Sequence, residues 1–249
     1  MAKNKQFIRP KGQQAGYRGN PDGENQNPDD DDTLVDIVEV REQAQDFFEK
    51  HQYLVIGVIA GLLLLIGGYL AYKYAYQEPR EQAGMEAMYK AEFQFKQDSF
   101  ALALTQPGEG MEGFLEIIES YSGTKASNLA SYYAGISYLN LGQFEAAIDY
   151  LKDYTAEDDI TPITKYGALG DAYAETNDMD QALSNYKKAA DSDNGFLTPY
   201  YLSKLGVLNM KQGNNDAALT NYKRIEADYP QSAESKDAKK YIALLDSMS

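Results

Sequence analysis

A pattern of small and large residues that occurs three times constrains the fold of this chain more than any other feature. Glycine follows Ala or Leu at Gly135, Gly170 and Gly206, which lie 35 and 36 residues apart. Alanine follows at the same interval, at Ala147, Ala182 and Ala218, and large side chains stand four residues further on, at Leu151, Tyr186 and Tyr222. In stacked helix pairs, small residues let the helices approach and large residues fill the space between them. The pattern predicts an all-α solenoid of helix hairpins.

The period is close to the 34 residues of tetratricopeptide repeats, each of which is one helix hairpin. Gly, Asn or Asp in LGQFEAA, TNDMDQA and QGNNDAA predicts the turn inside each hairpin, and Pro162 and Pro199 are expected at helix starts. We predict a repeat domain over 77–249. Its expected parts are a degenerate hairpin at 80–122, repeats at 126–159, 163–195 and 198–230, and a capping helix at 233–248.

The segment from Leu54 to Tyr72 carries no charged residue. Its length is about that needed to cross a hydrocarbon core of roughly 30 Å, so we predict a single N-terminal transmembrane helix at 53–76. Before it, apolar residues recur every three or four positions, which predicts an amphipathic interfacial helix at 34–52. Residues 1–33 are almost devoid of apolar side chains after Ile8, and we expect a disordered leader there.

Small residues inside the predicted span also suggest a packing face. Gly57 and Gly61 are four residues apart, and Gly68 follows on the same side of an ideal helix. Seven Lys and Arg residues precede the span in a short flank. Because short flanks rich in positive charge stay in the cytoplasm, we expect a cytoplasmic N-terminus and a C-terminal domain on the opposite side of the membrane.

Composition excludes most enzyme chemistry. The chain has no cysteine and one histidine, His51, and it lacks the GxxxxGK[ST], GxSxG and HExxH motifs. We expect no catalytic residue, metal site, cofactor or small-molecule substrate. With 38 acidic and 23 basic residues, and no basic cluster after the span, the chain is also not expected to bind nucleic acid.

An open array of hairpins offers an extended surface for protein partners, lined by the first helix of each hairpin. We predict a partner-binding groove at the outward positions of those helices: Leu129, Tyr132, Ile136, Asp171, Tyr200, Val207 and Met210, with Thr164, Ala174 and Ser203 beside them. These positions are apolar, aromatic or acidic. Because Lys, Arg and Asn are missing from them, we expect exposed apolar segments rather than a free carboxylate to be bound.

The segments VREQAQDFFEKHQ, MEAMYKAEF and FLEIIESYSGTKASNLASYYAGISYLNLGQFEAAIDYL, together with one N-terminal span, resemble YfgM-type inner-membrane-anchored tetratricopeptide proteins of Gram-negative bacteria. The likeness extends over about residues 40–249, and only the longer leader departs from it. The resemblance implies a periplasmic repeat domain that associates with Sec translocon channel subunits and periplasmic chaperones and assists unfolded exported proteins.

Two other roles fit the same architecture. The first is a periplasmic scaffold for envelope or outer-membrane protein assembly or for cell division. The second is an organelle-import receptor, which requires the repeat domain to lie in the cytosol. Partner identity, the oligomeric state and whether the groove binds peptides or a fixed subunit stay open at the level of the sequence.

Overall fold

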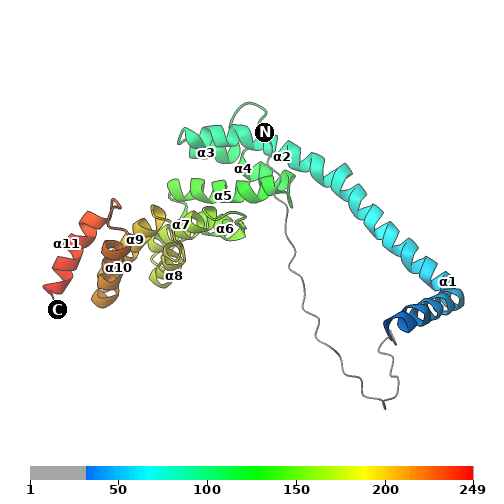
Figure 1. Ribbon diagram of the computed structural model, residues 1–249. Helices are drawn as coiled ribbons and strands as arrows, with labels where there is room; N and C mark the ends of the chain where they lie inside the picture. The colour runs from blue at the N-terminus through cyan, green and yellow to red at the C-terminus, as the bar shows by residue number, and fades with distance from the viewer. Residues whose placement is uncertain (1–31, 249) are drawn as a thin grey trace, which may run out of the picture. The chain divides into compact units, whose positions relative to one another are not determined.

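The computed structural model describes residues 32–248, and every regular element among them is a helix (Figure 1). The chain divides into two units, Met1–Leu65 and Ile66–Ser249. The predicted leader lies outside the described residues except for its last two positions. The all-α fold expected from the repeat pattern is confirmed.

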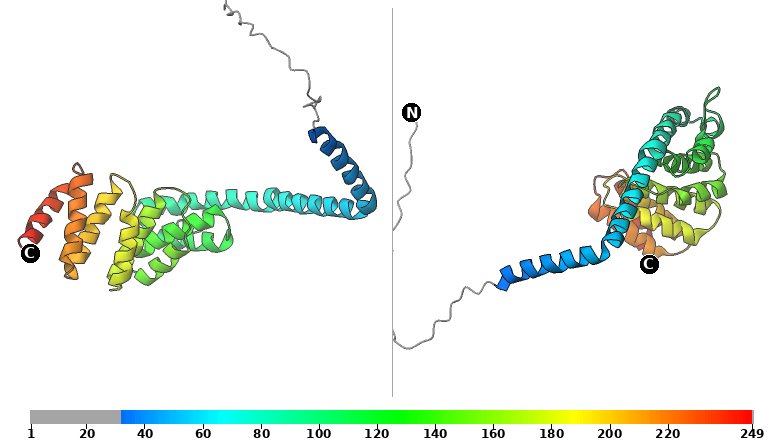
Figure 2. Two further views of the ribbon diagram at one scale, coloured as in Figure 1. Left: turned by 60° about the horizontal axis from the view of Figure 1, so that its bottom comes forward. Right: turned by 90° about the vertical axis from the view of Figure 1, so that its right-hand side faces the viewer.

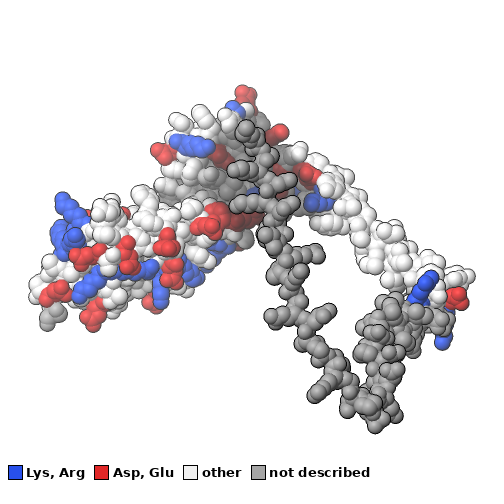
Figure 3. Space-filling model, viewed as in Figure 1, with Lys and Arg blue, Asp and Glu red and all other residues white. Residues whose placement is uncertain are grey.

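Helix α1 (Asp32–Tyr72) contains the uncharged segment. Its backbone leaves helical geometry at His51 (φ −123°, ψ 23°), close to the boundary predicted between the interfacial and transmembrane helices. The helical run Phe47–Lys96 is long and apolar enough to span a membrane, judged by length and composition. Its apolar side chains are exposed, as at Leu64 and Leu65, and they form the uncharged stretch seen in Figure 3.

Helix α2 (Glu78–Lys96) follows α1 through one π-helical turn, η1 (Lys73–Gln77), without a loop. The start of α2 is bound tightly to the array. The carboxylate of Glu81 accepts hydrogen bonds from the backbone N–H groups of Lys125 (2.8 Å) and Ala126 (3.2 Å), which open helix α5. Arg80 donates to the carbonyl of Ser120 (2.8 Å). These bonds satisfy backbone groups that a helix end leaves unpaired.

The predicted degenerate hairpin contains one more helix than expected. Between α2 and α4 (Phe114–Ser120) the chain forms the short helix α3 (Phe100–Thr105). Ala103 and Leu104 of α3 are buried in the same core cluster as Phe114. A Cβ on Gly113 would lie 2.4 Å from the carbonyl oxygen of Leu104, so glycine permits this close return of the chain.

The remaining helices form three hairpins and a cap. They are α5 (Lys125–Asn140) with α6 (Phe144–Asp153), α7 (Thr161–Glu175) with α8 (Met179–Ala190), α9 (Leu197–Lys211) with α10 (Asn215–Asp228), and α11 (Ser235–Asp246). Each first helix packs its repeated glycine against the large residue of the second. A Cβ would lie 2.5 Å from Leu151 at Gly135, 2.4 Å from Tyr186 at Gly170 and 2.4 Å from Tyr222 at Gly206. The small and large positions of the repeat therefore meet in space.

The turns inside the hairpins share one backbone conformation. Gly142, Asn177 and Gly213 have φ values of 72°, 63° and 76°. A left-handed residue ends a helix by turning its last carbonyls toward the following N–H groups, and glycine adopts this conformation most readily. The turn chemistry expected from the sequence is found in all three hairpins, with asparagine replacing glycine in the second.

The helices of the array follow one another in chain order, from green to red in the left view of Figure 2. Their buried apolar residues form three clusters. One joins α2, α3, α4 and α5, the next joins α5 and α6 to α7, and the largest runs from α7 to α11. Each cluster is shared only by neighbouring helices, as in other solenoids. The faces that point away from these clusters are available for partners.

Candidate partner-binding groove

The first helices of the hairpins line a cleft of about 570 Å³, here called the α7–α9 cleft. Its walls come from the ends of α5 and α6, from α7 and from α9, with Tyr186 of α8 at its base. The lining residues are Leu139, Asn140, Phe144, Asp171, Ala174, Glu175, Tyr186, Ser203, Lys204, Val207, Leu208 and Lys211. Four of the residues predicted from the sequence meet there: Asp171, Ala174, Ser203 and Val207.

A cation held between aromatic rings occupies one side of this cleft. The ammonium of Lys204 forms an ion pair with Asp171, and the hydroxyl of Tyr186 donates to the same carboxylate. The Lys204 ammonium also lies 5.6 Å from the ring centre of Tyr186 and 5.1 Å from that of Tyr200. Cations favour the faces of such rings. This cluster joins the second hairpin to the third through side chains of α7, α8 and α9.

Burial and hydrogen bonding shift the pKa values of Tyr186 and Lys204. Burial, followed by the hydrogen bond to Asp171, raises the pKa of Tyr186 well above its ordinary value. Burial alone lowers the pKa of Lys204, but the bond to Asp171 and its charge outweigh that effect, and the net shift is upward. Lys204 is therefore charged and Tyr186 neutral at physiological pH. Asp171 meets a partner as one member of a neutralised pair rather than as a free carboxylate.

The other predicted groove residues differ in how far they are accessible. Tyr200 and Val207 are exposed, at 42% and 38%. Tyr132 is partly buried, donates to the hydroxyl of Thr164 (2.8 Å) and packs its ring against Tyr154 (5.1 Å between ring centres). Met210 packs into the largest core cluster, where its sulfur accepts from the hydroxyl of Tyr222 (3.8 Å). Exposure thus favours Tyr200 and Val207 as partner contacts over Met210.

Ile136 is partly buried against the second core cluster. Leu129 lines a separate cleft of about 350 Å³ between α2 and α5, called the α2–α5 cleft, together with Met85 and Tyr154. Met85 begins a row of exposed apolar side chains on α2, which continues with Tyr89 and Phe93. Residues four apart share one side of a helix, so the spacing of positions 85, 89 and 93 in the sequence already indicated an apolar row on α2.

Sequence reasoning also missed the polar residues of the α7–α9 cleft. Lys204, Lys211 and Asn140 line it, although Lys and Asn were expected to be absent from the groove. Lys204 is engaged by Asp171, whereas Lys211 and Asn140 are exposed at the ends of their helices. The error arose because each first helix presents a wider arc to the cleft than the outermost positions alone.

Comparison with known families identifies the repeats. Residues 168–233 and residues 129–158 match two tetratricopeptide repeat families. The chain carries tetratricopeptide repeats. The longer match covers most of the second and third hairpins, and the shorter match covers most of the first. A search of curated proteins found no match to this chain.

Tetratricopeptide repeats indicate protein–protein interaction, and neither matching family is catalytic. The two matched ranges together include every residue that lines the α7–α9 cleft. In the apolar helix, a Cβ built on Gly57, Gly61 or Gly68 would meet nothing within 4 Å. These glycines leave space for a neighbouring helix, and the packing face there stays a prediction.

Proposed function

We propose that this chain is a membrane-anchored adaptor that binds exposed apolar segments of other proteins and performs no catalysis. The observation that carries the proposal is the α7–α9 cleft, where exposed Val207 lies beside a neutralised Lys204–Asp171 pair. An apolar segment gains from contact with Val207, Phe144 and Leu139, and the fixed ion pair needs no new partner.

The finer role that we propose is that of an ancillary subunit of the Sec translocon in the bacterial inner membrane. The N-terminus then lies in the cytoplasm and the repeat domain in the periplasm. There the domain passes newly exported proteins to periplasmic folding factors. This proposal is supported by the resemblance to YfgM-type proteins and by the long apolar helix.

A site-specific crosslink tests the groove. A photoreactive amino acid at Val207 or Tyr200, in the full chain expressed in Gram-negative cells, is expected to capture exported polypeptides or Sec channel subunits. The same group at Thr220, an exposed residue of α10 outside the cleft, serves as the control. Equal products from all three positions would contradict a partner-binding groove.

Topology is tested separately. Protease added to intact cells should leave the repeat domain whole, and permeabilising the outer membrane should expose it. Digestion from the cytoplasmic side alone would reverse the orientation and leave the import receptor as the better reading. Recovery of outer-membrane assembly or septal proteins, in place of Sec subunits, would favour the periplasmic scaffold.

A further inference from the structure

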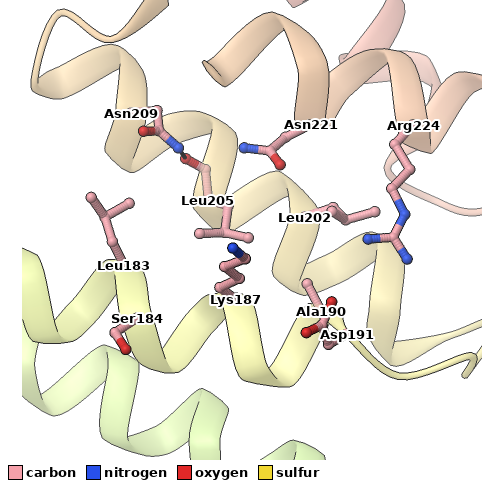
Figure 4. Close-up of a pocket in the computed structure, with 10 residues that line it drawn as sticks. All are labelled: Leu183, Ser184, Lys187, Ala190, Asp191, Leu202, Leu205, Asn209, Asn221 and Arg224. Carbon is pink, nitrogen blue, oxygen red and sulfur yellow. Dashed lines mark hydrogen bonds between the residues drawn. The ribbon is translucent and has the colours of Figure 1, made fainter.

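Another cleft lies on the other side of α9, between α8 and α10, and is called the α8–α10 cleft (Figure 4). Its volume is about 320 Å³. It uses Leu202, Leu205 and Asn209 of α9, whereas the α7–α9 cleft uses Lys204, Val207 and Lys211. Successive residues of an α-helix are about 100° apart around its axis, so the side chains of these two sets point in different directions from α9. The α7–α9 and α8–α10 clefts therefore lie on different faces of α9 and have different linings.

The chemistry of the α8–α10 cleft is distinctive. Leu183, Leu202 and Leu205 supply an apolar lining, and Lys187 of α8 and Arg224 of α10 reach it from two sides (Figure 4). One carboxylate, Asp191, stands against these two cations. A second carboxylate, Asp228, lies 3.6 Å from Nε of Arg224. Leu183 is partly exposed and covers the buried Leu202 and Leu205, so the lining combines a small apolar area with positively charged donors.

Several donors in this cleft have no partner within the part of the chain that the structure describes. Among the described residues, none forms a hydrogen bond or ion pair with the side chains of Lys187, Ser184 or Asn221. Asn209 uses its amide N–H to bind the Leu205 carbonyl (2.8 Å). Ammonium, guanidinium and amide donors around an apolar lining match a segment that carries carboxylates beside apolar side chains.

The charge distribution along the array supports the same assignment. Residues 77–178 hold 6 basic and 18 acidic residues, whereas residues 179–249 hold 9 of each. The cleft lies entirely within the second, balanced part. An acidic partner is repelled by the first part and meets its most favourable potential near α8 and α10.

We propose that the α8–α10 cleft is a second docking site, and that its occupant is an acidic, leucine-rich segment of a partner protein. The α7–α9 cleft then takes an apolar client while the α8–α10 cleft holds a fixed partner. The inference is independent of the Sec assignment and adds a second surface to the proposed adaptor role.

The test uses the full chain in nanodiscs of zwitterionic phospholipid. Two fluorescent peptides of equal length are compared by anisotropy, one built of Leu and Glu and the other of Leu and Lys in the same order. The Leu/Glu peptide is expected to bind more tightly, and added salt should weaken its binding. Reversal of both cations, in Lys187→Glu with Arg224→Glu, should raise its Kd about tenfold or more, because attraction becomes repulsion.

Two further variants separate a lost site from a lost fold. Ser184→Trp fills the cleft from an exposed position without changing the charge, and it should also weaken binding of the Leu/Glu peptide. Lys236→Glu, on an exposed site of α11 outside the cleft, is the matched control and should leave binding unchanged. Circular dichroism of each variant checks that the helices persist.

The outcomes distinguish this site from the proposed groove. Val207→Asp should impair crosslinking to clients from the photoreactive group at Tyr200 and leave the Leu/Glu peptide bound. Equal binding of the two peptides, or binding that the double charge reversal and Ser184→Trp leave intact, would refute the α8–α10 site without touching the groove. Displacement of the Leu/Glu peptide by inorganic phosphate, beyond the effect of sodium chloride at the same ionic strength, would show an anion site in place of a docking site.

Discussion

The ring of Tyr201 on α9 lies directly against Gly167 on α7. A Cβ built on Gly167 would stand 1.9 Å from the hydroxyl oxygen of Tyr201 and 2.1 Å from Cζ. This contact joins the second hairpin to the third, whereas the repeated glycines join the two helices of one hairpin. Close packing between hairpins thus depends on a glycine outside the repeated pattern.

Gly167→Ala should therefore destabilise the array. The added methyl group displaces the whole ring of Tyr201, and overpacking of this kind costs about 1–3 kcal/mol. Urea denaturation followed by circular dichroism measures the loss. Gly195→Ala is the control, because a Cβ there meets nothing within 4 Å, and it should change the free energy of unfolding by less than about 0.5 kcal/mol. Equal effects of both changes would show that the contact does not constrain the array.

The turn of the second hairpin gives a second prediction. Asn177 has a left-handed backbone (φ 63°), which glycine tolerates and β-branched residues resist. Asn177→Gly should leave stability within about 0.5 kcal/mol of the parent, and Asn177→Val should lower it by about 1–2 kcal/mol. Thermal unfolding of the two variants side by side provides the measurement. Similar midpoints would mean that the turn relaxes to another conformation.

The ion pair in the α7–α9 cleft should couple its two members. Lys204 and Asp171 are each less than a third exposed, so removing one leaves the other poorly solvated. We expect Lys204→Met and Asp171→Asn each to cost about 1–2 kcal/mol. The double variant should cost less than the sum, with a coupling of roughly 1 kcal/mol. Strict additivity in the denaturation series would show that the pair is not an energetic unit.

Alkaline pH should weaken the array through its buried tyrosines. Burial, followed by the nearby Tyr241, raises the pKa of Tyr222 to about 12. The unfolded pKa is about 10, so folding favours the neutral phenol. The stabilisation is complete below pH 10 and is lost as the pH rises toward 12. Stability measured between pH 9 and 12 should fall less steeply in Tyr222→Phe than in the parent.

The control for this pH series is Tyr89→Phe, which removes an exposed phenol. It should reproduce the parent profile. Tyr222→Phe is itself expected to fold, because the hydroxyl makes only a long contact to the sulfur of Met210 (3.8 Å). Identical slopes in the parent and in Tyr222→Phe would show that Tyr222 ionises freely in the folded protein.

The sequence predicts the hairpins because their packing follows a fixed local period. Gly135 and Leu151, for example, lie in one repeat and meet wherever two helices pair. Contacts between repeats have no such period. Lys204 and Asp171 are 33 residues apart, and Glu81 binds backbone groups 44 and 45 residues away. Periodicity gave no reason to pair these residues. The Lys204–Asp171 ion pair and the hydrogen bonds that attach α2 to the array were therefore seen only in the structure.

Helix α3 and the α8–α10 cleft were missed for another reason. FALALT is too short for a helical period to be recognised, and its burial depends on the close return of the chain at Gly113. The α8–α10 cleft is lined from three helices, and its cations look solvated when each helix is considered alone. Predictions from single helices capture the faces that pack and miss the hollows that several helices form together.

The bonds from Arg80 and Glu81 to the first hairpin have a mechanical consequence. Helix α2 follows η1 without a loop, and its first turn is fixed to the start of α5 and the end of α4. The start of α2 is therefore part of the packed array and does not act as a flexible linker to the first hairpin. A truncation that removes Arg80 and Glu81 would therefore also leave the first backbone N–H groups of α5 and the last carbonyl of α4 without these partners.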